Sequence, residues 1–302
     1  MKRRVIQIAD STQLISLPRK WAVQHGIKKG DELEVEAQGN RVVVSTTNAL
    51  DIEAAEIHPP HVLNITERYV TSNYRSGCKE IKVHYNNKIN PDLVSFLSKK
   101  MDDQTIGYEL VTQENNYLVI KDLSGTSDKD FDAALRRSFV LLTSLINDSL
   151  EAYKNNDLTT LQNMYYIDRS INKFTNFCAR ELISRNRNDI KLTAFYYHFV
   201  RTFESLADQF SLLAVYSSTN SKLISKPFIL AYTEIQGIMA DFYSVFYKYS
   251  KESVNKLYLR VKKLKTSDLF GSSKTDAVMI YYLVTIHFRI KELIDSLIDI
   301  NV

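Results

Sequence analysis

Cationic side chains are concentrated at the start of the chain. Residues 1–30 hold seven lysines and arginines against the single acid Asp10, a net charge of +6, whereas the whole 302-residue chain carries +4. The other 272 residues therefore carry about −2. A basic excess confined to one segment is typical of contact with a nucleic-acid phosphate backbone, although a plain solvated surface has the same composition. The candidate contacts are Lys2, Arg3, Arg4, Arg19 and Lys20.

Patterns that would indicate catalysis are missing from the sequence. It contains no recognisable nucleophile–base pair, no G-x-G phosphate loop among its eight glycines and no Cys/His cluster with metal-site spacing. His58 and His61 flank two prolines, but two histidines without further ligands make a weak metal site. We therefore expect a protein that is not an enzyme.

Residues 5–44 must position the basic side chains. Their pattern predicts a strand, a turn, a short helix that follows Pro18 and ends at Gly26, and a hairpin that turns at residues 38–40. So small a unit has too little apolar area for a core of its own. We expect its apolar residues to pack against a second copy in an obligate homodimer.

Two stretches of this segment are distinctive: SLPRKW at residues 16–21 and HGIKKGDELEV at residues 25–35. Together they resemble the SpoVT/AbrB/MazE family of swapped-hairpin DNA-binding domains. The resemblance implies that two hairpins interleave into one dimeric β-barrel, with a basic face that contacts double-stranded DNA. We expect residues 1–48 to be this DNA-binding and dimerisation domain.

Length and composition indicate a multidomain α+β chain of two or three domains. Only 8 glycines and 5 prolines interrupt it, which favours long helices. Cys78 and Cys178 make no disulfide framework, as expected in a reducing compartment. The start MKRR leads into no apolar signal region, and the longest apolar run, residues 278–286, is too short for a membrane span. We expect a cytoplasmic protein without membrane insertion.

Residues 49–125 are predicted to hold a linker and a small α+β unit. The stretch 45–62 has the composition of a connector stiffened by its two prolines. The pattern then predicts a helix near 62–74, a strand at 79–85, a helix with Asn90 as N-cap and Pro91 in its first turn, and a hairpin over 108–123. We expect a spacer or a second dimerisation surface.

From residue 128 onward apolar residues recur at helical spacing. Six helices are predicted, with breaks at residues 155–157, 187–189, 217–221 and 271–273. The polar break at 217–221 divides them into two sets, which predicts tandem three-helix bundles over residues 126–302. The third and sixth helices are loosely similar, since residues 201–210 can be aligned with residues 288–297.

This helical region resembles the PhoU family, in which two repeated three-helix bundles regulate phosphate uptake. The order of the two resemblances is typical of archaeal-type phosphate-uptake regulators. PhoU-like proteins bind metal clusters through E/D-x-x-x-D motifs, because carboxylates at i and i+4 share a helix face. Glu204 and Asp208 keep the motif and Asp168 is a candidate to face them, which implies a divalent metal or iron in the first bundle. Lys291 replaces the acid in the second repeat, so no metal is expected there.

Ordinary structural roles remain open for these acids and for two histidines. Glu204 and Asp208 also fit a salt-bridged helix surface with Arg201 and Arg180 as partners. The histidines lie among aromatic residues and are expected in the core: His198 and His287.

A basic helix is expected near residues 251–265. Its cations Lys256, Arg260 and Lys263 lie on one face, opposite an apolar stripe. A solvated surface, a second nucleic-acid contact and a dock for an anionic partner all fit this pattern.

The sequence therefore predicts a dimeric DNA-binding transcription regulator, linked to phosphate uptake or phosphate sensing through its PhoU-like region. The alternative is a signalling adaptor that docks on a phosphate transporter or kinase and uses the N-terminal domain only to dimerise. Binding of DNA, or pull-down of a transporter subunit without DNA, distinguishes the two.

Overall fold

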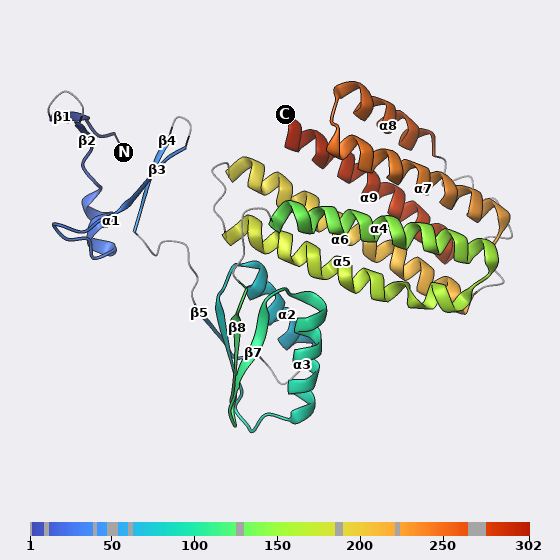
Figure 1. The fold of residues 1–302 in the computed structure, drawn as a ribbon, viewed down its shortest axis with the longest axis horizontal. Coiled ribbons are helices and arrows are strands. Elements are labelled where there is room, and N and C mark those ends of the chain that lie inside the picture. The colour runs from blue at the N-terminus through green and yellow to red at the C-terminus, as the bar shows by residue number, and fades with distance from the viewer. Residues whose placement is uncertain are drawn as a thin grey trace. The chain divides into compact units, whose positions relative to one another are not determined.

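The computed structural model describes residues 2–8, 12–38, 41–46, 54–59, 63–124, 130–184, 190–220, 224–264 and 276–302. The chain divides into two compact units, Met1–Leu50 and Asp51–Val302. Among the described residues, the first unit has short strands and one short helix, and the second has a sheet and long helices (Figure 1). None of the helices within these ranges is long and apolar enough to cross a membrane.

The strands of the first unit form two antiparallel pairs. The pairs are β1 (Ile6–Ile8) with β2 (Thr12–Leu14), and β3 (Glu34–Gln38) with β4 (Arg41–Ser45). The hairpin predicted at the end of this segment is confirmed, although Gly39 and Asn40 of its turn lie outside the described residues. The interleaved dimeric barrel requires a second chain and stays a prediction.

The short helix of the first unit is α1 (Arg19–Gln24). It begins after Pro18, whose fixed φ suits the start of a helix. It ends before Gly26, where a φ of +66° is a left-handed conformation that glycine adopts without steric cost. Both boundaries agree with the sequence pattern.

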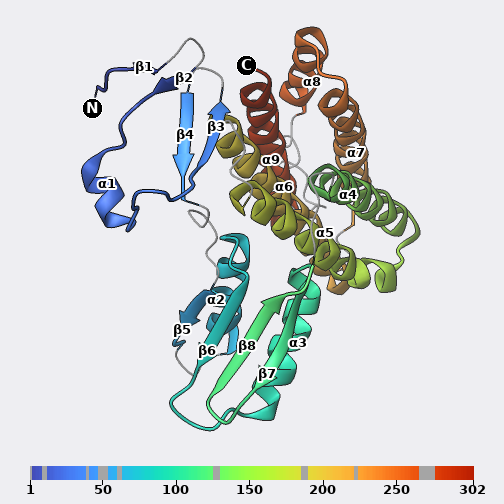
Figure 2. The same ribbon diagram turned by 60° about the vertical axis from the view of Figure 1, so that its left-hand side comes forward.

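The second unit begins with a four-stranded sheet in the order β5-β6-β8-β7, with two helices on the same side of it (Figure 2). β5 runs parallel to β6, and the other neighbouring strands are antiparallel. The elements are β5 (Ala54–Ile57), α2 (Leu63–Arg75), β6 (Glu80–His84), α3 (Pro91–Gln104), β7 (Tyr108–Gln113) and β8 (Tyr117–Asp122). Asn90 caps α3 as predicted, accepting the Asp92 N–H at 2.9 Å.

Strand β5 corrects the interpretation of residues 45–62 as a plain connector. Its four residues pair with β6 from Ala54 opposite Glu80 to Ile57 opposite Val83. A four-residue strand followed by proline has a weak local pattern, because its pairing partner lies 26 residues further along the chain. In the His-Pro-Pro-His stretch at residues 58–61, Pro60 and His61 lie outside the described residues.

The helix layer of this sheet also contacts the long helices, since both α2 and α3 pack on α5. Tyr74, Ile81 and Leu118 are among the fully buried residues of the local core. The sheet therefore belongs to the same compact unit as the helices that follow it, and a role in dimerisation stays a prediction.

Six long helices complete the second unit in the part of the chain that the structure describes. They are α4 (Asp130–Asn155), α5 (Leu158–Ser184), α6 (Ile190–Thr219), α7 (Lys226–Tyr247), α8 (Lys251–Lys263) and α9 (Ala277–Asn301). Within α4–α6, and again within α7–α9, every helix contacts the other two, and α6 packs on α9 (Figure 1). All six share one continuous apolar core. The internal repeat predicted from the sequence stays a prediction.

Local signals set several of these helix boundaries. Asp157 accepts the Thr160 N–H at 3.0 Å at the start of α5, and Ser225 accepts the Phe228 N–H at 3.4 Å at the start of α7. The predicted break at residues 217–221 is wrong at its beginning, because Ser217 is buried inside α6 and donates to the Leu213 carbonyl. The breaks predicted at 187–189 and 271–273 lie outside the described residues.

Candidate functional site

The first unit presents large apolar side chains to solvent. Val35 and Val42 are each 65 % exposed and Val5 is 63 % exposed. Together they belong to a groove lined by Val5, Gln13, Leu14, Ile15, Leu17, Leu33, Val35, Val42 and Val44. Full burial of one such side chain stabilises a fold by about 1.5–3 kcal/mol, and contiguous apolar surface of this kind marks an interaction site. The groove is therefore a candidate interface.

The predicted DNA contacts also lie on the first unit. Arg3 and Arg4 precede β1, whereas Arg19 and Lys20 form the first turn of α1. All four side chains, and that of Lys2, are exposed. They are thus available to an anionic partner, and contact with DNA stays a prediction.

A polar cleft of about 510 Å³ lies between α2, α3 and α6 of the second unit. Its lining combines four cations with three acids and two neutral side chains: Glu67, Arg68, Thr71, Arg75, Lys100, Gln104, Arg201, Glu204 and Asp208. Arg75 Nη1 donates to Asn176 Oδ1 at 3.1 Å, and Arg201 lies 3.1 Å from Glu204. Burial and the nearby Arg201 charge lower the pKa of Arg75. Two guanidinium groups that repel each other make this cleft a candidate anion site.

The three predicted metal ligands are brought near one another on α5 and α6. Burial, followed by the charges of Asp208 and Glu204, raises the pKa of Asp168 to about 8. Burial also raises the pKa values of Glu204 and Asp208. The contact of Asp168 with Asp208 adds to this rise in pKa, so a proton on Asp168 would relieve the repulsion between the two carboxyl groups.

These carboxylates nevertheless do not form a set of three ligand atoms within 4.8 Å of one another. In the described part of the chain that condition is met by Glu56, His58 and His84. Binding of a metal by the acidic residues stays a prediction.

The structure gives buried or short-range partners to Arg180 and Arg260, two cations whose roles the sequence left open. Arg180 does not pair with the acids of α6, because it is buried and its Nη2 lies 2.6 Å from Asp122. Arg260 on α8 is held by Glu234 at 2.8 Å and Asp241 at 2.5 Å, which leaves it less available to an external anion.

The two histidines expected in the core differ from each other. His287 is buried, with Nε2 3.0 Å from the Val261 carbonyl oxygen, as predicted. His198 is exposed on α6, so the prediction is wrong for it. The two cysteines, Cys78 and Cys178, are both buried and neither forms a disulfide.

Sequence reasoning missed most of the cleft. Arg68 and Arg75 come from α2 and Lys100 from α3, more than a hundred residues from the α6 side chains that line the same cleft. No local spacing relates these elements, because the contact depends on how α2 and α3 pack on α5.

Residues 6–49 match a family model described as antidote-toxin recognition MazE, bacterial antitoxin. The match supports the resemblance found in the first unit. No curated protein and no solved structure matches the chain. The PhoU resemblance of the helical region has no corresponding family match and stays a prediction.

Proposed function

We propose that the chain is a dimeric DNA-binding transcription regulator. The observation that carries the proposal is the MazE-type match over residues 6–49, in a segment that also concentrates the positive charge. The exposed apolar groove supports dimerisation, because a second copy would cover its valines and leucines. The exposed cations at positions 2–4 and 19–20 would contact phosphates on the same dimer.

Fluorescence-anisotropy titration of labelled genomic fragments tests this proposal. The variant replaces four cations of the first unit: Arg3→Ala, Arg4→Ala, Arg19→Ala and Lys20→Ala. The control removes the same charge from exposed positions of α8: Lys251→Ala, Lys256→Ala, Lys262→Ala and Lys263→Ala. Each phosphate contact contributes about −0.9 to the slope of log K against log salt. We expect the first variant to lose affinity and slope, and the control to keep both.

The control also decides between the alternatives for the basic helix. Equal loss in both variants would mean that net charge or a contact through α8 carries the binding, and the assignment to the first unit would be wrong. Sedimentation of each variant must give the wild-type assembly state, because a monomer would lose affinity for another reason.

We further propose that the helical region links this regulator to phosphate uptake or phosphate sensing. The support is the PhoU resemblance and the cationic side of the cleft, where Arg75 and Arg201 lie close together. Addition of inorganic phosphate should change DNA affinity in the wild type and not in the Arg75→Gln variant. An identical phosphate response in both would remove the cleft from the proposal.

A divalent metal or iron at Asp168, Glu204 and Asp208 remains part of this proposal. Elemental analysis of the protein as purified, compared with its Asp208→Asn variant, tests it. Equal metal content in the two preparations would refute a site at these acids.

The second candidate is a signalling adaptor that docks on a phosphate transporter or kinase. The exposed apolar groove of the first unit also fits this candidate, because dimerisation through the groove requires no DNA. If no duplex binds at low salt, with or without phosphate and divalent metal, the first unit serves dimerisation only and the adaptor becomes the leading function.

A further inference from the structure

Two histidines and a glutamate come together on the open side of the sheet. Glu56 lies on β5, His58 follows that strand and His84 ends β6. Glu56 and His58 are two residues apart along the chain, and alternate residues of an extended segment project from the same face. The parallel register places Glu56 opposite Lys82 and Ile57 opposite Val83, which puts His58 level with His84. The sheet itself thus aligns the three side chains.

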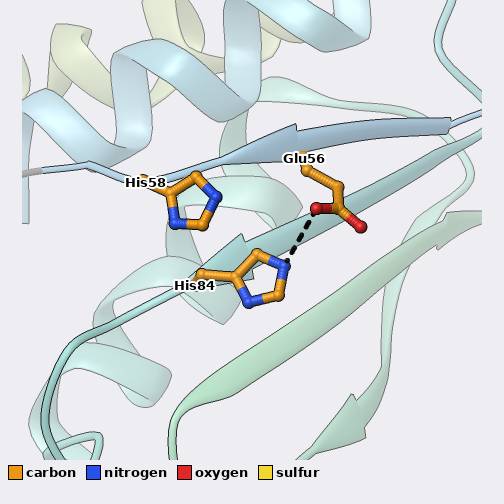
Figure 3. Close-up of side chains that lie close together, drawn as sticks. All are labelled: Glu56, His58 and His84. Carbon is orange, nitrogen blue, oxygen red and sulfur yellow. Dashed lines mark ion pairs between the residues drawn. The ribbon is translucent and has the colours of Figure 1, made fainter.

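The distances suit a small metal ion. Ligand atoms of the three side chains all lie within 4.8 Å of one another, and Glu56 Oε2 is 3.5 Å from His84 Nε2. Ligands about 2.1 Å from a tetrahedral zinc ion lie about 3.4 Å apart. Figure 3 shows one nitrogen of each imidazole on the side of the Glu56 carboxylate. One edge of the coordination tetrahedron is therefore already present, and His58 offers the third ligand atom within the same 4.8 Å limit.

The surroundings of the His84 ring also favour a bound metal ion. Its Nε2 atom is shielded from solvent and has no hydrogen-bond partner in the described part of the chain, although the Glu56 carboxylate faces it. The His58 and His84 rings stack 4.7 Å apart with only 14° between their planes. A shielded ring nitrogen without a hydrogen bond is unfavourable, and a bound cation would satisfy it.

Lys82 is the cation that could compete for this position. It is the register partner of Glu56, but its ammonium group lies over the Tyr117 ring, 4.4 Å from the ring centre. The lysine charge therefore has a partner elsewhere, and the Glu56 carboxylate remains directed toward His84.

We propose that Glu56, His58 and His84 bind a divalent transition-metal ion of the zinc class. Two imidazoles and a carboxylate are a donor set that zinc accepts, with a fourth position left for water. Because its ligands come from β5 and β6, the ion links the edge strand to its neighbour. Metal binding stabilises β5, the strand that follows the first unit in the chain.

Zinc titration of the chelator-treated full chain by calorimetry tests the proposal. The variants are His58→Asn, His84→Asn and Glu56→Gln, and the matched control is His198→Asn, an exposed histidine on α6. Loss of a supporting contact around a metal site weakens affinity by about 10–100-fold, so loss of a direct ligand should weaken it at least as much. We expect one zinc per chain in the wild type and the control, with at least about tenfold weaker binding in each ligand variant.

A structural readout separates this site from the acidic residues of α5 and α6. Zinc should slow amide exchange over residues 54–58 in the wild type and in Asp208→Asn, and should leave it unchanged in His84→Asn. The proposal is overturned if the wild type binds no zinc, or if both histidine variants bind as the wild type does. It is also overturned if only Asp208→Asn loses binding.

Discussion

Replacement of Arg180 should weaken the contact between the sheet of the second unit and helix α5, and so lower the free energy of unfolding of that unit. Arg180 Nη2 lies 2.6 Å from Asp122 Oδ2, and Nη1 donates to the Tyr74 and Cys78 carbonyl oxygens at 2.8 Å each. The two charged side chains are only 5 % and 11 % exposed. The guanidinium also lies over the Tyr74 and Tyr108 rings, 5.0 and 5.2 Å from their centres. The Arg180 side chain on α5 thus contacts four parts of the sheet region: α2, the loop after α2, β7 and β8.

The Arg180→Met substitution keeps an apolar stem and removes the charge. Breaking a buried ion pair by removing one partner costs about 3–5 kcal/mol. Asp122 would keep two donors, Ser124 N at 2.9 Å and Ser124 Oγ at 2.6 Å. The Tyr74 and Cys78 carbonyls also keep one other hydrogen bond each. We therefore expect a loss near the lower limit, about 3 kcal/mol in the free energy of unfolding.

Urea unfolding followed by helical circular dichroism measures this loss in the second unit. Trp21, the single tryptophan, lies in the first unit and reports its unfolding separately by fluorescence. The control is Arg289→Met, which removes a pair with Glu292 that is equally short, 2.7 Å, but 37 % and 47 % exposed. Exposed pairs contribute about 0–1 kcal/mol. If Arg180→Met costs no more than Arg289→Met, the buried pair does not hold the sheet to the helices.

Three further predictions follow from single positions. The pKa of Asp168 is raised to about 8 in the folded protein. The folded state therefore keeps a proton that the unfolded state loses, and stability falls as pH rises from about 4 toward 8, by at most about 1.4 kcal/mol per pH unit. In metal-free protein Asp168→Asn should raise the melting temperature at pH 8 but not at pH 4, relative to the control Asp148→Asn on the exposed side of α4. Val35→Lys in the apolar groove should shift the protein toward monomer in analytical ultracentrifugation, whereas Val23→Lys, 72 % exposed on α1 and outside the groove, should not. Gly77→Ala should cost about 1–3 kcal/mol in thermal unfolding, because φ is +90° and the new Cβ would lie 2.5 Å from a serine hydroxyl of α5; an unchanged melting temperature would contradict the strain.

The helices could be predicted from the sequence because their signals are local. Apolar residues recur every three or four positions, and Asn90 accepts a backbone N–H group as predicted for an N-cap. The acidic residues of α6 could be predicted for the same reason, since an i, i+4 pair shares a face in any helix. Their proximity to Asp168 needed the further fact that α5 packs on α6.

Strand β5 and the site beside it could not be predicted, because both depend on strand register. His58 was visible in the sequence, but its neighbour in space is His84, which lies 26 residues away. The sequence offered only His61 as a neighbour of His58 along the chain, a pair too weak to predict a site, whereas the sheet selects partners across strands. The partner of Arg180 could not be predicted for a similar reason, since Asp122 ends a strand of the sheet, whereas the sequence offered the acids of α6 as its candidates.

Because β5 is short, its stability depends strongly on the contacts made beside it. Only four residues pair it to β6, at the edge of the sheet, and α2 begins a few residues later. α2 supplies Arg68 and Arg75 to the polar cleft. An ion held by Glu56, His58 and His84 would therefore act on the segment that joins the first unit to the cleft-forming helix. A short edge strand has few hydrogen bonds of its own. Binding of an ion at this site would therefore change the stability of β5 by a larger fraction than it would change the stability of a long helix.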